Sequence, residues 1–394
     1  MRILTILAAL CGTALLSQPA HAAPVWAGAW GYAAADASGA DAQTLPPGTY
    51  RYRVRLTQAG DALQLTFSNA EGDSALVIAS ASVASPAGGS GTEIAAGTVH
   101  ALTFSGHPGA NLPQGHALIS DPLAVPVRNA QDLIVSVTFS TATRIARTNL
   151  GMEMAFAPAE AAGAFTPIRA RSYLSLVSVR TAAAPCTVVA FGDSITDGFL
   201  SLSAQSRGWP GRLAERMAAL PAARRCGVVN MGISGNRVLR PGRATSALDR
   251  FWRDVASVPS VTHVVFLEGI NDIGAGASEG PGAVAAEDLI HGYRQFVARA
   301  HALGITVVGG TMTPALRAGY MSPAKERTRE AVNAAIRTGH IFDGVVDFDA
   351  AVRNPAAPSE LRPEFDPGDH LHPNDAGLRA MGDAVDLSLL APRR

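Results

Sequence analysis

Residues 187–198 read TVVAFGDSITDG, and this stretch decides the fold class of the second half of the chain. It opens with a mostly apolar run, which is typical of a strand buried on both faces of a parallel sheet. The run ends in glycine, aspartate and Ser194. Because ligands bind beyond the carboxyl ends of such strands, a serine at this place is a candidate nucleophile. The other interpretation of Ser194 is an ordinary helix cap.

The sequence around this stretch alternates between strand and helix patterns from about Pro185 onward. Strands are expected at 187–191, 228–230, 261–267, 305–309 and 345–348, and helices at 209–220, 285–303, 323–338 and 374–390. Strands that alternate with helices predict a parallel sheet with helices on both faces. The pattern G-x-S-x-G of the α/β-hydrolase elbow is missing, and the serine follows the first strand. We therefore expect a flavodoxin-like, three-layer α/β domain over residues 185–394.

The first half of the chain has a different hydrophobic periodicity. Tyr50, Tyr52, Val54 and Leu56 alternate with polar residues, which is the period of a half-buried strand. A turn follows and the alternation resumes, which indicates a hairpin. Further strands are expected at 75–83, 99–104, 123–127 and 133–139, separated by Gly and Pro clusters. Short strands with frequent turns predict an all-β sandwich or jelly roll over residues 24–180.

The first 22 residues have the pattern of an export signal. Arg2 is followed by a short apolar stretch and by Ala20-His21-Ala22, an A-x-A cleavage site. Residues 1–22 are therefore expected to be removed, leaving a periplasmic or secreted protein. The apolar stretch is short for a membrane span, and an uncleaved anchor is the alternative. The formal net charge is zero, which gives no sign of a nucleic-acid partner.

Two cysteines, Cys186 and Cys226, remain after the expected cleavage. Each precedes an expected strand, so neighbouring parallel strands would bring them to the same edge of the sheet. An exported chain meets oxidising conditions, and a disulfide is expected. Closing a loop of about 40 residues stabilises by roughly 4 kcal/mol in the chain-entropy model. Two free buried thiols are the alternative.

Four short polar segments, at 192–194, 230–236, 269–272 and 369–374, fall after expected strands. Taken singly, each has a plain interpretation. Gly235 could be a turn glycine, Asn271 a capping residue and His372 a structural histidine. Their order along one sheet edge favours an active site.

This ordered set resembles the SGNH hydrolase superfamily, also called the GDSL esterases and lipases, over about residues 185–390. The resemblance implies a serine esterase in which Ser194 is the nucleophile, His372 the base and Asp369 the acid that orients it. It further implies an oxyanion hole formed by the backbone N–H groups of Ser194 and Gly235 and the side chain of Asn271. No metal or cofactor is expected. The first half is similar to the β-domain that precedes this domain in some exported bacterial members.

The expected reaction is the removal of small acyl groups, most readily acetyl, from carbohydrate. An extracytoplasmic lipase or lysophospholipase is the enzymatic alternative, and a noncatalytic carbohydrate-binding protein is the alternative from another class.

Several other polar and aromatic residues are expected to have structural roles. Three aspartates do not have the spacing of a calcium loop, His370 could line the pocket or shape a turn, and four aromatic residues are expected in the core rather than on a sugar-stacking surface. These residues are Asp347, Asp349 and Asp366, and Trp26, Trp30, Tyr50 and Tyr52.

Overall fold

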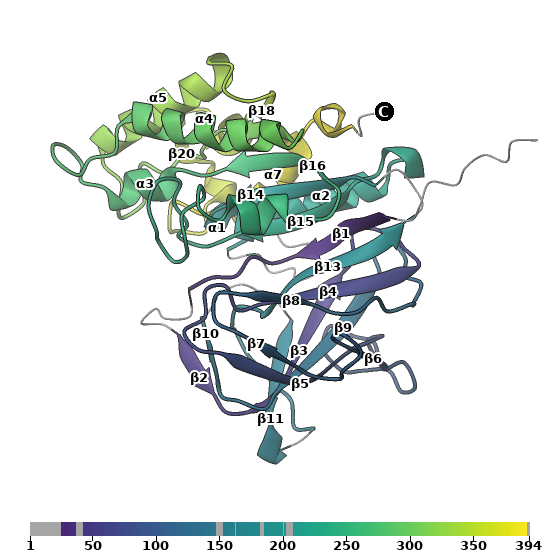
Figure 1. Ribbon diagram of the computed structural model, residues 1–394. Coiled ribbons are helices and arrows are strands. Elements are labelled where there is room, and N and C mark those ends of the chain that lie inside the picture. The colour runs from purple at the N-terminus through teal and green to yellow at the C-terminus, as the bar shows by residue number, and fades with distance from the viewer. Residues whose placement is uncertain are drawn as a thin grey trace, which may run out of the picture.

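The computed structural model describes residues 25–36, 42–146, 153–161, 163–181, 185–199, 201 and 208–391. The expected export signal at 1–22 lies outside the described residues. Figure 1 shows two parts, an antiparallel β-domain and an α/β domain with helices around a central sheet. None of the helices in the described ranges has the length and apolar character needed to cross a membrane.

The β-domain is built from two antiparallel sheets that share one core. The first sheet has the order β1 (Val25–Gly31), β13 (Leu174–Thr181), β4 (Ala62–Ser68) and β8 (Ala117–Ile119). The second has the order β12 (Thr166–Pro167), β11 (Met154–Pro158), β3 (Gly48–Arg55), β9 (Asp132–Phe139), β5 (Leu76–Ala84) and β6 (His100–Leu102), with β7 (Ala110–Leu112) also on β5. A separate pair joins β2 (Gln43–Leu45) to β10 (Thr143–Ile145).

Period-two alternation produces this core. Tyr50, Tyr52, Val54 and Leu56 are all buried and pack with apolar residues of β4, β9 and β13. The predicted strand at 123–127 is wrong, because only isolated bridges form there. Prolines at positions 122 and 126 explain the difference, since each lacks the N–H that a ladder requires.

The second half forms the predicted α/β fold. Its five parallel strands have the order β15 (Gly227–Gly232), β14 (Thr187–Gly192), β16 (Val261–Leu267), β17 (Thr306–Gly310) and β18 (Gly344–Val346). In chain order this is 2-1-3-4-5, the flavodoxin-like arrangement. Strand β14 lies between β15 and β16, so the residues that follow it are flanked by two loops at the switch point.

Helices cover both faces of this sheet and complete three layers. One apolar cluster joins the sheet to α4 (Ala286–Ala302) and α5 (Pro323–Thr338), and another joins it to α2 (Gly208–Ala218), α6 (Phe348–Val352) and α7 (Asp375–Ala384). Two short helices, α1 (Ser194–Asp197) and α3 (Ile270–Ala275), follow β14 and β16, and β19 (Arg353–Asn354) pairs with β20 (Ala357–Leu361).

Some smaller elements complete the chain. A π turn spans Trp252–Ala256, and 3-10 turns span Ala159–Ala161, Ala222–Arg224, Pro363–Phe365 and Leu387–Leu390. The predicted helix at 374–390 is therefore too long. Val385 and Asp386 adopt extended backbone, and the Asp386 carboxylate accepts from Ser388 N–H to begin the last turn.

Cys186 and Cys226 form a disulfide, with their Cα atoms 4.6 Å apart. Each lies one position before its strand, and β14 and β15 pair in parallel from Thr187 opposite Gly227. The bond therefore ties the amino ends of the two strands whose carboxyl ends carry the polar segments.

The β-domain is docked against the edge of the parallel sheet, where β1 runs along β15 (Figure 1). Thr57 Oγ1 donates to Val228 O at 3.0 Å and accepts from Val228 N–H at 2.9 Å. A Cβ on Gly227 would lie 2.0 Å from Gly28 O, so the two backbones meet where only glycine fits. This contact covers an edge strand that would otherwise present unpaired backbone groups.

Candidate active site

Ser194 is the first residue of α1, directly after β14. Asp193 caps this helix, because its side chain accepts the Ile195 N–H at 2.9 Å. Gly198 ends it in the left-handed region, with φ of 90°, and its N–H bonds back to Ser194 O. One tight turn therefore holds the Ser194 hydroxyl at the carboxyl edge of the central strand.

His372 reaches Ser194 from the other end of the domain. Its Nε2 lies 2.8 Å from Ser194 Oγ, and its Nδ1 lies 2.7 Å from Asp369 Oδ2. The other oxygen of Asp369 accepts the backbone N–H groups of Leu371 and His372, both at 3.0 Å. A ring of Phe199 lies 4.3 Å from the imidazole, measured between centroids. Serine, histidine and aspartate thus form one chain of hydrogen bonds.

The hydrogen bonds around Asp369 keep it ionised. Partial burial alone acts to raise the pKa of this carboxyl. The bonds from the His372 side chain and from the two backbone N–H groups outweigh burial and lower the pKa to about 2. An anion therefore faces Nδ1 of His372 across the range in which most enzymes work.

Two loops bring Gly235 and Asn271 to the same edge. Gly235 follows β15 with φ of 77°, and Asn271 is in α3 just after β16. Asn271 Nδ2 donates to Asn236 O at 3.0 Å, which joins the two loops. Asp272 joins them again by accepting the N–H groups of Val238 and Leu239. Among the described residues, neither Ser194 N–H nor Gly235 N–H is donated to an acceptor.

Arg250 supports the carboxyl ends of the strands at this site, and the sequence did not indicate it. It is 1% exposed and donates to Gly192 O at 3.0 Å, to Met231 O at 2.7 Å and to Asn236 Oδ1 at 2.8 Å. Its charge is paired with Asp254 at 3.0 Å and Glu268 at 3.4 Å. A single guanidinium therefore fixes the ends of β14 and β15. Residues 247–256 mix charged and apolar side chains, so the sequence does not indicate which of the two arginines there is buried.

Arg171 also supports the site, and it comes from the β-domain. Its guanidinium lies 2.6 Å from Asp197 of α1 and donates to Gly232 O at 2.7 Å. The Tyr32 ring lies over it at 3.8 Å. The residue is 4% exposed. The β-domain thus supplies a buried cation to the helix that begins with Ser194.

A group of buried carboxyls lies near the strand ends. Burial raises the pKa of Asp193 to about 7 and that of Glu268 well above its ordinary value. Burial also raises the pKa of Asp272, although the N–H groups of Val238 and Leu239 oppose the change. Perturbed carboxyls at a strand edge are typical of functional sites.

A cleft of about 460 Å³ opens beside Gly235 and Asn271. Arg237, Arg243 and Tyr320 line it as well. The Tyr320 hydroxyl donates to Asn271 Oδ1 at 3.4 Å. The lining of this cleft therefore combines polar and apolar surface and includes two cations.

The aspartates with plainer interpretations take part in ion pairs. Asp347 and Asp349 both contact Arg337, and Asp349 also contacts Arg329. Asp366 accepts from the His370 ring at 2.5 Å and from its N–H, so His370 shapes a turn with φ of 60°. In the described ranges, no three His, Cys, Asp or Glu side chains are grouped to hold a metal ion.

The aromatic residues divide into two groups. Tyr50 and Tyr52 are in the core, as predicted. Trp26 and Trp30 are only partly buried. The expectation of a core position therefore holds for the two tyrosines. Trp30 packs against the same core but is only partly buried, and it also lines a cavity at the domain junction.

Comparison with known protein families identifies the α/β domain. Residues 190–380 match the model of the GDSL-like Lipase/Acylhydrolase family. This domain belongs to that family, the resemblance to SGNH hydrolases is confirmed, and the protein is an ester-hydrolysing enzyme. A search of curated proteins finds no match.

Solved structures are similar to about half of the chain. Axe2, an acetylxylan esterase from Geobacillus stearothermophilus, is 22% identical, covers 51% of this chain and 92% of its own, and has a TM-score of 0.39. A GDSL-like lipase from Bacteroides thetaiotaomicron is 22% identical, with coverage of 52% and 87% and a TM-score of 0.39. LAE5, an α/β hydrolase enzyme from the metagenome of Lake Arreo, is 22% identical, with coverage of 51% and 93% and a TM-score of 0.39.

Proposed function

We propose that the protein is a serine esterase that forms an acyl-enzyme on Ser194. The observation that carries the proposal is the continuous set of hydrogen bonds from Ser194 Oγ to His372 Nε2, and from His372 Nδ1 to Asp369. This is the arrangement that activates a serine hydroxyl at neutral pH.

The reaction proceeds in two half-reactions. His372 Nε2 takes the proton as Ser194 Oγ attacks the ester carbonyl, and a tetrahedral oxyanion forms. His372 then returns that proton to the departing alcohol, which leaves an acyl ester on Ser194. In the second half, His372 takes a proton from water, the hydroxide attacks the acyl ester, and Ser194 Oγ leaves with that proton. The products are one alcohol and one carboxylic acid.

The oxyanion is stabilised by the Ser194 and Gly235 N–H groups and by Asn271 Nδ2. Both N–H groups lack an acceptor among the described residues, as stated above. The amide of Asn271 has two N–H bonds, and the contact with Asn236 O uses one of them. Donors fixed in advance stabilise the transition state without reorganising.

The substrate in this proposal is a small acyl ester, most readily acetyl, on carbohydrate. Its support is the cleft beside Gly235 and Asn271, where the charged side chains of Arg237 and Arg243 form part of the wall. A long acyl chain is better accommodated by an apolar wall. The sequence also lacks a long apolar segment near Ser194 that could cover a lipid.

The test compares hydrolysis of p-nitrophenyl acetate with that of p-nitrophenyl palmitate. The proposal expects kcat/KM to be far higher for the acetate and expects acetate release from an acetylated polysaccharide. A strong preference for the long chain would favour the lipase or lysophospholipase alternative. Full absence of hydrolysis on both would favour a carbohydrate-binding protein on an esterase scaffold.

Export is part of the same proposal. It is supported by the signal pattern at 1–22 and is compatible with the disulfide between Cys186 and Cys226. Intact mass of protein from the periplasm and the medium tests both points. The expected species begins near Ala23 and gains two alkylatable thiols only after reduction; a full-length chain or free thiols in the native protein would contradict it.

A further inference from the structure

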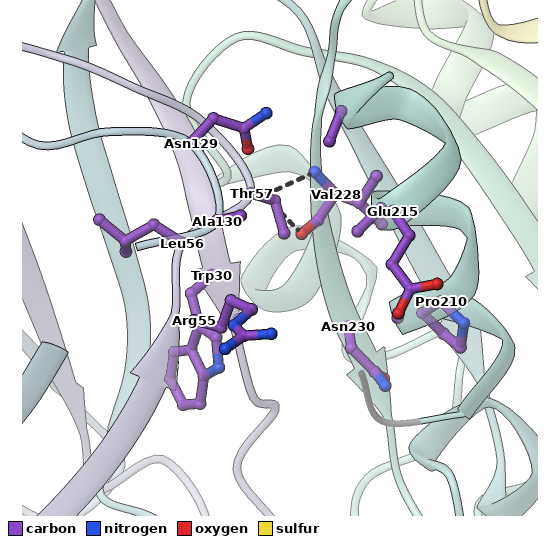
Figure 2. A pocket seen from close by; sticks show the side chains of 14 residues that line it. Trp30, Arg55, Leu56, Thr57, Asn129, Ala130, Pro210, Glu215, Val228 and Asn230 are labelled. Atoms are coloured by element: carbon purple, nitrogen blue, oxygen red, sulfur yellow. Dashed lines mark hydrogen bonds between the residues drawn. The ribbon is translucent and has the colours of Figure 1, made fainter. Parts of the chain in front are cut away.

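A second cavity, of about 120 Å³, lies at the junction of the two domains. Figure 2 shows Trp30, Arg55 and Asn129 on the β-domain side, opposite Glu215 of α2 and Asn230 of β15. The residues that line it include none of those that line the cleft at Gly235 and Asn271. It is therefore a separate candidate binding site.

The cavity exists because α2 presents small residues to the β-domain. This helix turns Trp209, Leu213 and Met217 into the core of the α/β domain. Its opposite side contributes the small residues Gly211, Ala214 and Ala218 to the junction, with Pro210 and Glu215 beside them, so space remains there. The helix thus leaves a gap where a larger side chain would fill the interface.

The β-domain does not close over this space, because hydrogen bonds between threonine side chains and the backbone hold it in place beside the cavity. Thr57 makes two hydrogen bonds to Val228, and Figure 2 shows both at the cavity. Gly28 N–H also donates to Thr187 Oγ1 at 2.9 Å. The cavity is therefore formed before any ligand arrives, which lowers the entropic cost of binding.

The lining combines one aromatic ring with polar groups of balanced charge. Trp30 is partly buried, and Pro210 and Val228 add apolar surface. Arg55 pairs with Asp132 at 2.7 Å and Glu215 pairs with Arg212 at 3.0 Å, and their side chains remain 39% and 37% exposed, so both can still contact a ligand. Their opposite charges favour neither an anion nor a cation.

A neutral pyranose matches this lining. One face of the ring carries C–H groups that can stack on an indole, and its edge carries hydroxyls that can bond to guanidinium, carboxylate and amide groups. An apolar cavity of about 150 Å³ holds one benzene molecule. The 120 Å³ available here therefore takes part of one sugar ring and no longer segment of a glycan. We propose that this junction is an accessory carbohydrate site that binds one neutral pyranose unit of a glycan chain.

The proposal goes beyond ester hydrolysis, because binding here does not require Ser194. The test uses full-length protein carrying Ser194→Ala, so that no probe is hydrolysed. Isothermal titration with cellohexaose, xylohexaose and mannohexaose measures the affinity for three neutral glycans. At least one is expected to bind, and Trp30→Ala is expected to weaken that binding by tenfold or more.

A second variant tests the same site by filling it. Ala214→Leu adds volume inside the cavity without removing a polar group, and it is expected to weaken binding to the same extent as Trp30→Ala. Trp252→Ala is the matched control, because Trp252 is 57% exposed and lies outside the cavity. This control is expected to bind as the parent does.

Two outcomes overturn the proposal. One is that none of the three hexasaccharides binds the Ser194→Ala protein. The other is that a hexasaccharide binds with equal affinity to the parent and to both cavity variants, which would place the glycan elsewhere. If Ala214→Leu lowers the Tm, Asn129→Ala reports on the same cavity from a loop, and unchanged binding in that variant and in Trp30→Ala would also overturn it.

Discussion

Ser194 Oγ lies 2.8 Å from His372 Nε2, although 178 positions of sequence separate the two residues. The five-stranded sheet makes this contact possible, because it places the turn after β14 next to the segment that precedes α7. Asn374 caps that helix by accepting the N–H groups of Ala376 and Gly377, so the position of His372 is fixed two residues before the helix cap.

Replacing Asp369 by asparagine should reduce kcat by roughly 10²–10⁴-fold, because the imidazole loses the anion that fixes its tautomer and stabilises its protonated form. The asparagine oxygen can still accept the N–H groups of Leu371 and His372, so the fold is expected to remain. Kinetics with p-nitrophenyl acetate measure the effect. Asp366→Asn is the control, since Asp366 pairs with His370 instead. Equal rates in the two variants would remove Asp369 from the mechanism.

Truncating Asn271 to alanine should lower kcat by about 10²–10³-fold and leave KM nearly unchanged, because an oxyanion donor acts on the transition state. Asn111→Ala, an exposed amide of the β-domain, should behave as the parent. A loss confined to KM would instead indicate that Asn271 binds the ground-state substrate.

Through Arg171, the β-domain contacts α1, the helix that begins with Ser194. Arg171→Met leaves Asp197 buried without its cation, and a broken buried pair costs about 3–5 kcal/mol of unfolding free energy. Denaturant unfolding measures this loss, and kcat should fall with it, because α1 carries Ser194. The matched control is Arg180→Met, whose partner Asp61 is exposed. Equal Tm values for the two variants would show that the β-domain does not support α1 through this contact.

Asp193 should make stability depend on pH. Its folded pKa of about 7 lies above the unfolded value of roughly 3.9, so the folded protein binds this proton more tightly. Stability from this group is therefore complete below pH 4 and is lost as pH rises to about 7. Asp193→Asn does not titrate and can still cap Ile195. The Tm of the variant relative to the parent should rise between pH 4 and 7 and then level off. A difference that stays constant over pH 4–8 would contradict the raised pKa.

Hydrophobic patterns in the sequence were sufficient to predict the strands with regular periodicity. Alternation at Tyr50, Tyr52 and Val54 predicted a buried strand, and apolar runs such as 261–267 predicted central parallel strands. Prolines at 122 and 126 broke a strand that the apolar residues alone suggested. The predicted final helix, 374–390, was too long because Asp386 can cap a new turn as readily as it can continue a helix.

Some residues of the site could likewise be predicted from the sequence, and others could not. The sequence indicated Ser194, Gly235 and Asn271, because they stand in short polar segments that follow β14, β15 and β16. The expectation that the segment 369–374 also follows a strand is wrong, since it comes after the 3-10 turn Pro363–Phe365. The resemblance to SGNH hydrolases indicated Asp369 and His372. Arg171 and Arg250 could not be predicted, since their role depends on burial among partners that are distant in sequence. The partial exposure of Trp30 could not be predicted either, because strand alternation does not reveal that α2 leaves a space in front of it.

The most direct test of the proposed serine mechanism is the trapping of an acyl-enzyme analogue on Ser194. Full-length protein is treated with a fluorophosphonate and examined by intact mass and peptide mapping, with p-nitrophenyl acetate hydrolysis followed in parallel. The account predicts one adduct on Ser194 that abolishes activity in step with labelling, and neither adduct nor hydrolysis in Ser194→Ala. Full hydrolysis by Ser194→Ala would contradict it.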